Sequence, residues 1–176
     1  LSNVESVEYD PINNRYLTSS DNSSIVAIAP NGALSYFGSG TDASHGMEVF
    51  DGRLFAINGS QIRSYDLTTE TQLSNTNISG AQFLNGMASN GVDIIWFTDF
   101  SVRDIYAMHV DDPTSYTMIA SNIAIPPNRL VYVGANNLCL FVTSCTGPLL
   151  PMHLHSYAIT PFYGSTGLLT IAFLSY

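Results

Sequence analysis

Four short stretches of similar composition recur at a near-constant interval along the chain. They are Val4-Glu-Ser-Val-Glu-Tyr9, Ser44-His-Gly-Met-Glu-Val49, Phe83-Leu-Asn-Gly-Met-Ala-Ser-Asn90 and Pro127-Asn-Arg-Leu-Val-Tyr132. With Glu5, His45, Asn85 and Asn128 as reference positions, the intervals are 40, 40 and 43 residues. A period of this size is typical of repeat architectures, in which each repeat is one supersecondary unit stacked on its neighbours.

Within each repeat, short apolar runs alternate with turn residues. Asp51-Gly52 and Asn58-Gly59 separate such runs in the second repeat and are strong hairpin signals. No stretch of ten or more residues carries a helical period with caps. Four strands in about 40 residues are typical of one propeller blade. The sequence therefore predicts an all-β propeller of about four four-stranded blades, each of roughly 40–43 residues.

We expect one propeller domain over residues 1–176, with blades at about 4–43, 44–83, 84–126 and 127–176. Four blades can close by themselves, although repeats of this length are more usual in larger rings. The ring is thus expected to be incomplete or closed by self-association. The last expected strand, Leu168–Ser175, is far more hydrophobic than its equivalents, and Thr146–Pro151 replaces a short polar turn. An exposed apolar edge favours a partner, so a homo-oligomer is expected.

Composition excludes several partners. The net charge is −9, and the five basic residues are all arginines, too few for phosphate-backbone binding, so nucleic acid is not expected as a partner. No run of about 18 apolar residues is present, so no membrane partner is expected. Asn22-Ser-Ser, Asn58-Gly-Ser and Asn77-Ile-Ser match the N-glycosylation triplet, which is common by chance in such a chain. The compartment stays open, with secretion slightly favoured over the cytoplasm.

Several motifs resemble those of a known family. They are Glu5-Ser-Val-Glu-Tyr-Asp-Pro11, Leu84-Asn-Gly-Met-Ala88, Trp96-Phe-Thr-Asp99 and Pro126-Pro-Asn-Arg-Leu130. Over about residues 3–145 the chain resembles the senescence marker protein/gluconolactonase (regucalcin-like) propellers. That resemblance implies a six-bladed lactonase with a divalent metal on the axis. It further implies metal ligation by Glu5 and Asn128, with Asn85 close to metal and substrate.

The chain also departs from this family at two points. Arg129 follows Asn128 where the family prefers Gly, which places a cation beside the expected metal and substrate. The family's Asp ligand and general base would lie one blade further on, and no matching blade is recognisable here. The hydrolytic machinery that the resemblance implies is therefore incomplete within this chain, and no catalytic residue is assigned.

The repeat itself predicts where these side chains lie. Equivalent starts of the innermost strands point at a common axis, so Glu5, Asn85 and Asn128 should share the mouth of a channel with His45. One carboxylate plus amide oxygens suits Ca²⁺. Imidazole at His45 is a poor Ca²⁺ ligand and would suit Zn²⁺ better, and Zn²⁺ is the less favoured metal. Alternatively, these side chains begin strands and satisfy backbone amides. For His45, a channel-lining or hydrogen-bonded position is favoured. Asn85, His45 and Arg129 are the candidate substrate contacts.

Three further features have simpler interpretations. Asp99 ends a strand, where a polar residue caps the following turn. Trp96 occupies an interior strand position and is expected in the core between blades. His153 and His155 alternate on one strand face with no acid or Cys partner signalled nearby, so a surface position is expected.

Two functions follow from the sequence. The first is a Ca²⁺-dependent hydrolase of a sugar lactone or similar ester, acting at the central channel. The second is a non-catalytic propeller that binds a carbohydrate or protein partner or serves as an assembly unit. The ring motifs favour the first, and the missing Asp ligand, Arg129 and the apolar tail favour the second.

Overall fold

The computed structural model describes residues 4–19, 24–124, 126–132, 137–142, 153–158 and 172–173, with side chains described up to Tyr132. These residues form four antiparallel sheets of four strands each, and no helix occurs among them. In every sheet the strands follow one another in chain order, so each sheet is a simple meander. We refer to the sheets as blades I to IV.

The strands and their bounds are as follows. Blade I contains β1 (Val7–Asp10), β2 (Arg15–Thr18), β3 (Val26–Ile28) and β4 (Leu34–Tyr36). Blade II contains β5 (Met47–Phe50), β6 (Arg53–Asn58), β7 (Gln61–Asp66) and β8 (Gln72–Asn77). Blade III contains β9 (Leu84–Ser89), β10 (Ile94–Asp99), β11 (Asp104–His109) and β12 (Asp112–Ala120). Blade IV contains β13 (Arg129–Tyr132), β14 (Asn137–Val142), β15 (His153–Ala158) and β16 (Ala172–Phe173).

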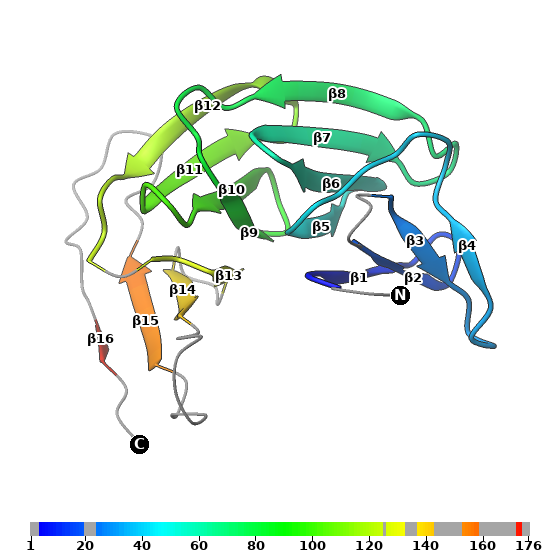
Figure 1. Ribbon diagram of the computed structural model, residues 1–176, viewed down its shortest axis with the longest axis horizontal. Coiled ribbons are helices and arrows are strands. Elements are labelled where there is room, and N and C mark those ends of the chain that lie inside the picture. The colour runs from blue at the N-terminus through cyan, green and yellow to red at the C-terminus, as the bar shows by residue number, and fades with distance from the viewer. Residues whose placement is uncertain are drawn as a thin grey trace.

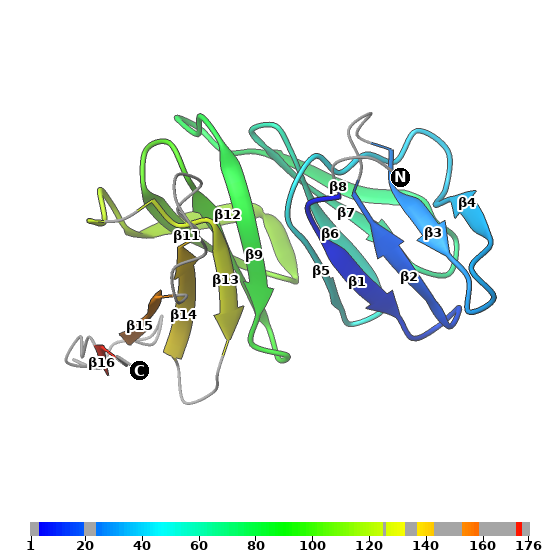
Figure 2. The same cartoon turned by 60° about the horizontal axis from the view of Figure 1, so that its bottom comes forward.

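The four blades follow one another around an open arc, with blade I at one end and blade IV at the other (Figure 1). The first strand of each blade lies on the inner side of the arc, and β1, β5, β9 and β13 contact one another in that order. Figure 2 shows β9 and β13 running side by side. The innermost strands therefore surround a common space, as the repeat predicts.

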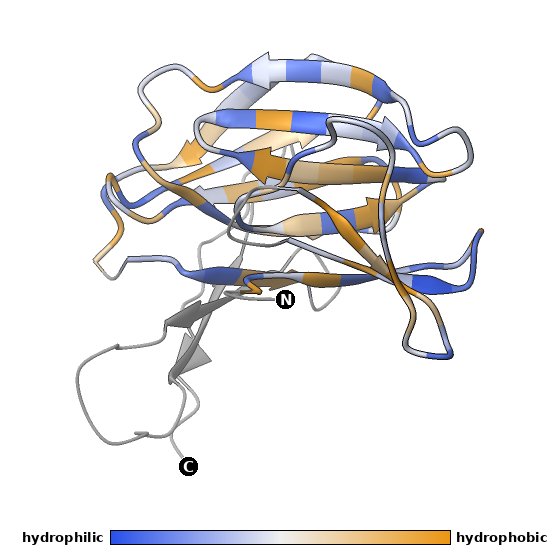
Figure 3. Cartoon of the chain, turned by 45° about the vertical axis from the view of Figure 1, so that its right-hand side comes forward, coloured by the Kyte–Doolittle hydropathy of each residue, from blue (hydrophilic) through white to orange (hydrophobic). Residues whose placement is uncertain are grey.

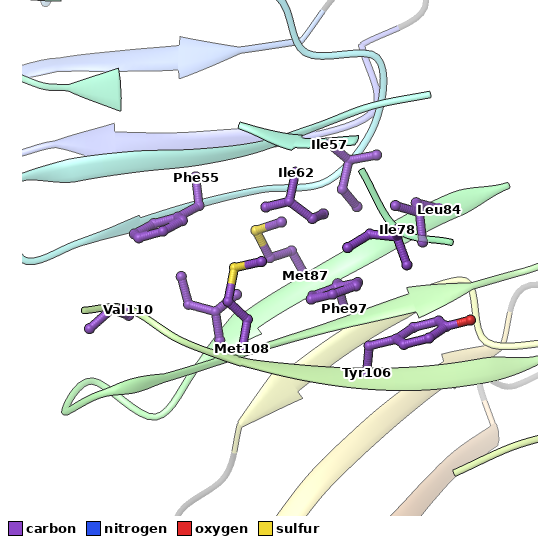
Figure 4. Close-up of a cluster of buried hydrophobic side chains, with 11 residues drawn as sticks. Phe55, Ile57, Ile62, Ile78, Leu84, Met87, Phe97, Tyr106, Met108 and Val110 are labelled. Carbon is purple, nitrogen blue, oxygen red and sulfur yellow. The ribbon is translucent and has the colours of Figure 1, made fainter. Parts of the chain in front are cut away.

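The hydrophobic core lies between blades rather than inside any one of them. Figure 4 shows one such cluster, in which Phe55 and Ile62 of blade II face Met87, Phe97 and Met108 of blade III. All five side chains are at most 5% exposed. A blade has two apolar faces and cannot bury either alone, so stacking blade on blade supplies the burial. Figure 3 shows apolar residues along the strands of the stacked sheets, and in β6 the four residues from Leu54 to Ile57 are all buried, as expected of a strand covered on both faces.

Two glycines let the innermost strands approach closely. A Cβ at Gly86 would lie 2.8 Å from the Arg129 Cα and 2.8 Å from the Asn128 carbonyl oxygen. Gly46 has the same role one blade earlier, where its N–H donates to the Asn85 carbonyl oxygen at 2.8 Å. Each blade thus meets the backbone of the next at the residue that follows the reference position.

The structure corrects some expected strand limits. Asp111-Asp-Pro113 is a sequence typical of a turn, yet Asp112 and Pro113 belong to β12, which pairs with β11 through bulges that absorb the extra residues. The first blade, expected from about residue 4, has its first strand from Val7 to Asp10. Of the expected strand at 168–175, only Ala172–Phe173 is described, as β16, and Thr146–Pro151 lies outside the described residues. The side chains of His153 and His155 in β15 also lie outside the description.

Candidate functional site

A cavity of about 580 Å³ lies on the inner side of the arc. All four first strands contribute to its lining. The lining residues are Glu5, Ser6, Glu8, Gly46, Met47, Glu48, Asn85, Gly86, Met87, Ala88, Ser89, Asn128, Arg129, Leu130, Val131 and Tyr132. This volume lies within the range of small-molecule sites in proteins. The polar groups of the lining are carboxyl, carboxamide, hydroxyl and guanidinium groups, which together both donate and accept hydrogen bonds.

Two glutamates of the cavity connect successive blades. Glu48 of blade II accepts a hydrogen bond from Ser89 Oγ of blade III at 2.6 Å, and a backbone hydrogen bond from the same residue. Glu8 of blade I accepts a backbone hydrogen bond from Val49 of blade II. Both glutamates lie three residues after their reference positions, so the same blade-to-blade contact occurs twice.

The cavity raises the pKa of both carboxyl groups. Burial, and then the neighbouring charge of Glu48, raise the pKa of Glu8 to about 7, while the Val49 hydrogen bond and Arg129 act in the opposite direction. Burial likewise raises the pKa of Glu48, opposed by Ser89 and by Arg129. A carboxyl group with a pKa near neutrality can donate as well as accept hydrogen bonds at physiological pH.

The contribution of Glu8 to the stability of the protein should fall as the pH rises from about 4.5 to about 7. Because the pKa of Glu8 in the folded state lies above its ordinary value of 4.5, the folded state binds more protons than the unfolded state in this window. Glu8→Gln mimics the protonated form. At pH 8 it should raise the Tm and increase the free energy of unfolding by at most about 3 kcal/mol. At pH 4 the variant and the parent should melt together. Calorimetry at both pH values measures this, and an equal change at both would contradict it.

The structure brings three of the four expected ring residues, Glu5, Asn85 and Asn128, into the lining of one cavity, whereas His45 is not among the lining residues. Asn85 Nδ2 donates to Asn128 Oδ1 at 2.7 Å, and both residues line the cavity together with Glu5. His45 Nδ1 lies 2.8 Å from Ser44 Oγ, and its ring packs edge-on against Phe83 at 4.6 Å. Burial lowers the pKa of His45, and Glu5 partly offsets this. The hydrogen-bonded position expected for His45 is confirmed, and its contact with a substrate stays a prediction.

The side-chain oxygens of Glu5, Asn85 and Asn128 supply part of the coordination that a hard cation needs. Glu5, Asn85 and Asn128 offer one carboxylate and two carboxamides, and Ca²⁺ would need water or ligand oxygens to complete six to eight contacts. The Asn85 carboxamide would first have to turn its oxygen inward, because its nitrogen now donates to Asn128. Among the described residues, no group of three or more His, Cys, Asp or Glu side chains is placed to hold a metal ion.

The sequence reasoning missed Glu8 and Glu48. The signal was available, because the two glutamates are 40 residues apart, the same interval that separates Glu5 from His45. Arg129, expected beside the site, does line the cavity, and its charge opposes the rise in the pKa of both glutamates. Two structural expectations are confirmed: Asp99 accepts backbone hydrogen bonds around its turn, and Trp96 stacks on Tyr132 at 5.3 Å between blades III and IV.

No known family matches the chain in a scan against family profiles, and no curated protein matches it either. Several solved structures do match the chain. The chain is similar to a nidogen/laminin complex structure, with a TM-score of 0.70 and 13% identity over 88% of this chain and 60% of the other. It is also similar to the extracellular domain of a putative hybrid two-component system, BT4673, from B. thetaiotaomicron, with a TM-score of 0.64 and 12% identity. That match covers 89% of this chain and 20% of the other.

These likenesses establish the fold. The first neighbour is a β-propeller, and the present chain is likewise a β-propeller whose ring is not closed by the described residues. The predicted fold class is thereby confirmed. The chain spans 60% and 20% of the two neighbours, whose identities are too low to carry any activity across. In the described part of the chain, no helix is long and apolar enough to cross a membrane.

Proposed function

We propose that this protein is a non-catalytic β-propeller module that binds a small hydroxyl-rich ligand, such as a sugar, in its central cavity. The observation that carries the proposal is the cavity itself, to which all four first strands contribute polar side chains. Sugars are bound by side chains that donate and accept in pairs, and the Glu48–Ser89 and Asn85–Asn128 pairs offer this chemistry. Tyr132, already stacked on Trp96, adds an aromatic surface to the wall.

The neighbours support a binding role outside the cytoplasm. One is a complex of two proteins, and the other is described as an extracellular domain. We accordingly propose that this module works outside the cytoplasm. The alternative ligand for the same cavity is a segment of another protein in place of a free sugar.

A second candidate is a Ca²⁺-dependent hydrolase of a sugar lactone. It is favoured by the position of Glu5, Asn85 and Asn128 in the lining of one cavity. In that function the three residues would hold the ion, and His45 and Arg129 would contact the substrate. The ion would polarise the lactone carbonyl and lower the pKa of a bound water molecule.

Titration calorimetry with glucose, galactose and mannose tests the first candidate. We expect saturable binding of at least one sugar, weakened about tenfold by Glu48→Gln, a loss of about 1.4 kcal/mol. Asp51→Asn is the matched control, because Asp51 lies in an exposed turn outside the cavity lining. The absence of saturable binding, or equal weakening by both variants, would contradict the proposal.

Titration with CaCl₂ and a hydrolysis assay with gluconolactone separate the two candidates. Calcium binding that Glu5→Gln abolishes, together with lactone turnover that requires calcium, would establish the hydrolase and displace the binding module. Sugar binding that is unchanged by calcium and by Glu5→Gln would establish the reverse.

A further inference from the structure

The charged groups that line the cavity do not balance one another. Glu5, Glu8 and Glu48 contribute three carboxyl groups, and Arg129 is the basic residue among the described residues of the lining. With all four groups ionised, three negative charges and one positive charge leave an excess of two negative charges. Arg129 is exposed, and its charge is the weakest of the four influences on the pKa of Glu8 and on that of Glu48. The guanidinium group therefore compensates the carboxyl groups only weakly.

The cavity has an acidic wall and an apolar wall. Glu8 and Glu48 lie three residues after the reference positions of blades I and II, on strands β1 and β5, which lie side by side (Figure 2). The equivalent residues of blades III and IV are Ala88 and Val131, and both line the cavity together with Tyr132. We call the first pair the acidic wall and the other three residues the apolar wall. A ligand of this cavity is therefore offered charge on one side and apolar surface on the other.

The carboxyl groups of the acidic wall retain acceptor capacity. Glu48 accepts from Ser89 Oγ at 2.6 Å and from the Ser89 backbone, and Glu8 accepts from the Val49 backbone. An ionised carboxylate has about four lone-pair sites, so each group can accept further hydrogen bonds. A hydroxyl group brings one donor, whereas an ammonium group brings three donors, a positive charge and no acceptor. The acidic wall therefore matches an ammonium group better than a hydroxyl group.

We propose that the ligand of the cavity is an amino sugar, with its ammonium group between Glu8 and Glu48 and its ring against the apolar wall. The inference rests on the sugar-binding function proposed above and names the class of sugar. An ammonium group at this position supplies the positive charge that Arg129 provides only weakly. Hydrogen bonds to ionised partners are about twice as strong as those between neutral groups, so the amino group should dominate recognition. Tyr132, whose ring stacks on Trp96 at 5.3 Å, offers an aromatic surface to the ring of the sugar.

Titration calorimetry with glucosamine, N-acetylglucosamine and glucose at pH 7 tests the charge of the ligand. We expect glucosamine to bind about tenfold more tightly than either neutral sugar, because only its amino group is charged. Equal binding of glucosamine and glucose would overturn the amino sugar and leave the sugar-binding function standing. Binding of none of the three sugars would overturn both. Tighter binding of Nα-acetyl-lysine amide than of glucosamine would overturn the amino sugar in favour of a lysine side chain.

Charge variants of the cavity test where the ammonium group lies. Glu8→Gln combined with Glu48→Gln should reduce the preference for glucosamine over glucose from about tenfold to about one. Arg129→Gln should increase this preference, because a competing cation is removed. Asp51→Asn, outside the lining, should leave the preference unchanged. A preference that survives in the double Gln variant would overturn the assignment of the ammonium group to the acidic wall.

Proton release gives a second measurement that does not depend on a double variant. Burial and the charge of Glu48 raise the pKa of Glu8 to about 7, against the Val49 hydrogen bond and Arg129, so at pH 6 most of this carboxyl group is protonated. An ammonium group beside it favours the ionised form, so glucosamine should displace up to about one proton and glucose none. Calorimetry in two buffers of different ionisation enthalpy measures this release, and Glu8→Gln should abolish it. Equal proton release with glucosamine and with glucose would contradict the proposal.

Discussion

Replacing Asp99 with alanine is expected to lower the free energy of unfolding by about 4 kcal/mol. The carboxylate is fully buried at the end of β10. Its Oδ2 accepts from the backbone N–H groups of Gln82 and Phe83, and its Oδ1 accepts from those of Ser101 and Val102. Alanine would leave four amides without this acceptor, in a position where little water can replace it.

The matched comparison is Asp66→Ala. Asp66 has the same role at the end of β7, where it accepts from the N–H groups of Thr68 and Thr69, but it is accessible to solvent. Water can satisfy the exposed amides, so we expect a loss of about 1 kcal/mol. Urea unfolding followed by circular dichroism measures both variants. If the two variants lost the same stability, burial of the Asp99 network would not be the reason for its effect.

Gly86→Ala is expected to destabilise the protein by about 2–3 kcal/mol, mainly by separating blades III and IV. The new methyl group would stand 2.8 Å from two backbone atoms and 3.0 Å from the Leu130 nitrogen. Backbone cannot rotate away as a side chain can, so β9 and β13 must move apart. The stacking of Trp96 on Tyr132 across the same junction should loosen, which the fluorescence of this single tryptophan reports.

Gly59→Ala separates this steric effect from the general cost of replacing a glycine. Gly59 lies in a turn at φ +61°, and no atom lies within 4 Å of its Cβ position. Alanine there should cost about 1 kcal/mol of backbone strain and leave the tryptophan fluorescence unchanged. A fluorescence change as large as that of Gly86→Ala would mean that blade packing is not what Gly86 protects.

The fold was largely predictable from local signals. The interval between Glu5, His45 and Asn85 and the turns at Asp51-Gly52 and Asn58-Gly59 define strands and blades without any tertiary contact. Strand limits were less predictable, as at Pro113, where pairing with β11 extends β12 through a position that the sequence favours for a turn. Glu5, Asn85 and Asn128 share one cavity because equivalent positions in stacked repeats face one axis, whereas His45 is not in its lining.

The amino-acid sequence alone does not show which residue of the adjacent blade each side chain contacts. The repeat alone determined that there are blades and that their first strands face a shared channel. Only the tertiary structure decided that Glu48 takes its hydrogen bond from Ser89, that burial raises the pKa of Glu8, and that Gly86 makes room for β13. These are properties of the space between blades, and burial and distance there depend on residues about 40 positions apart. The same reason explains Val7, which matches Met47 by sequence position but is 47% exposed because none of the described blades covers it.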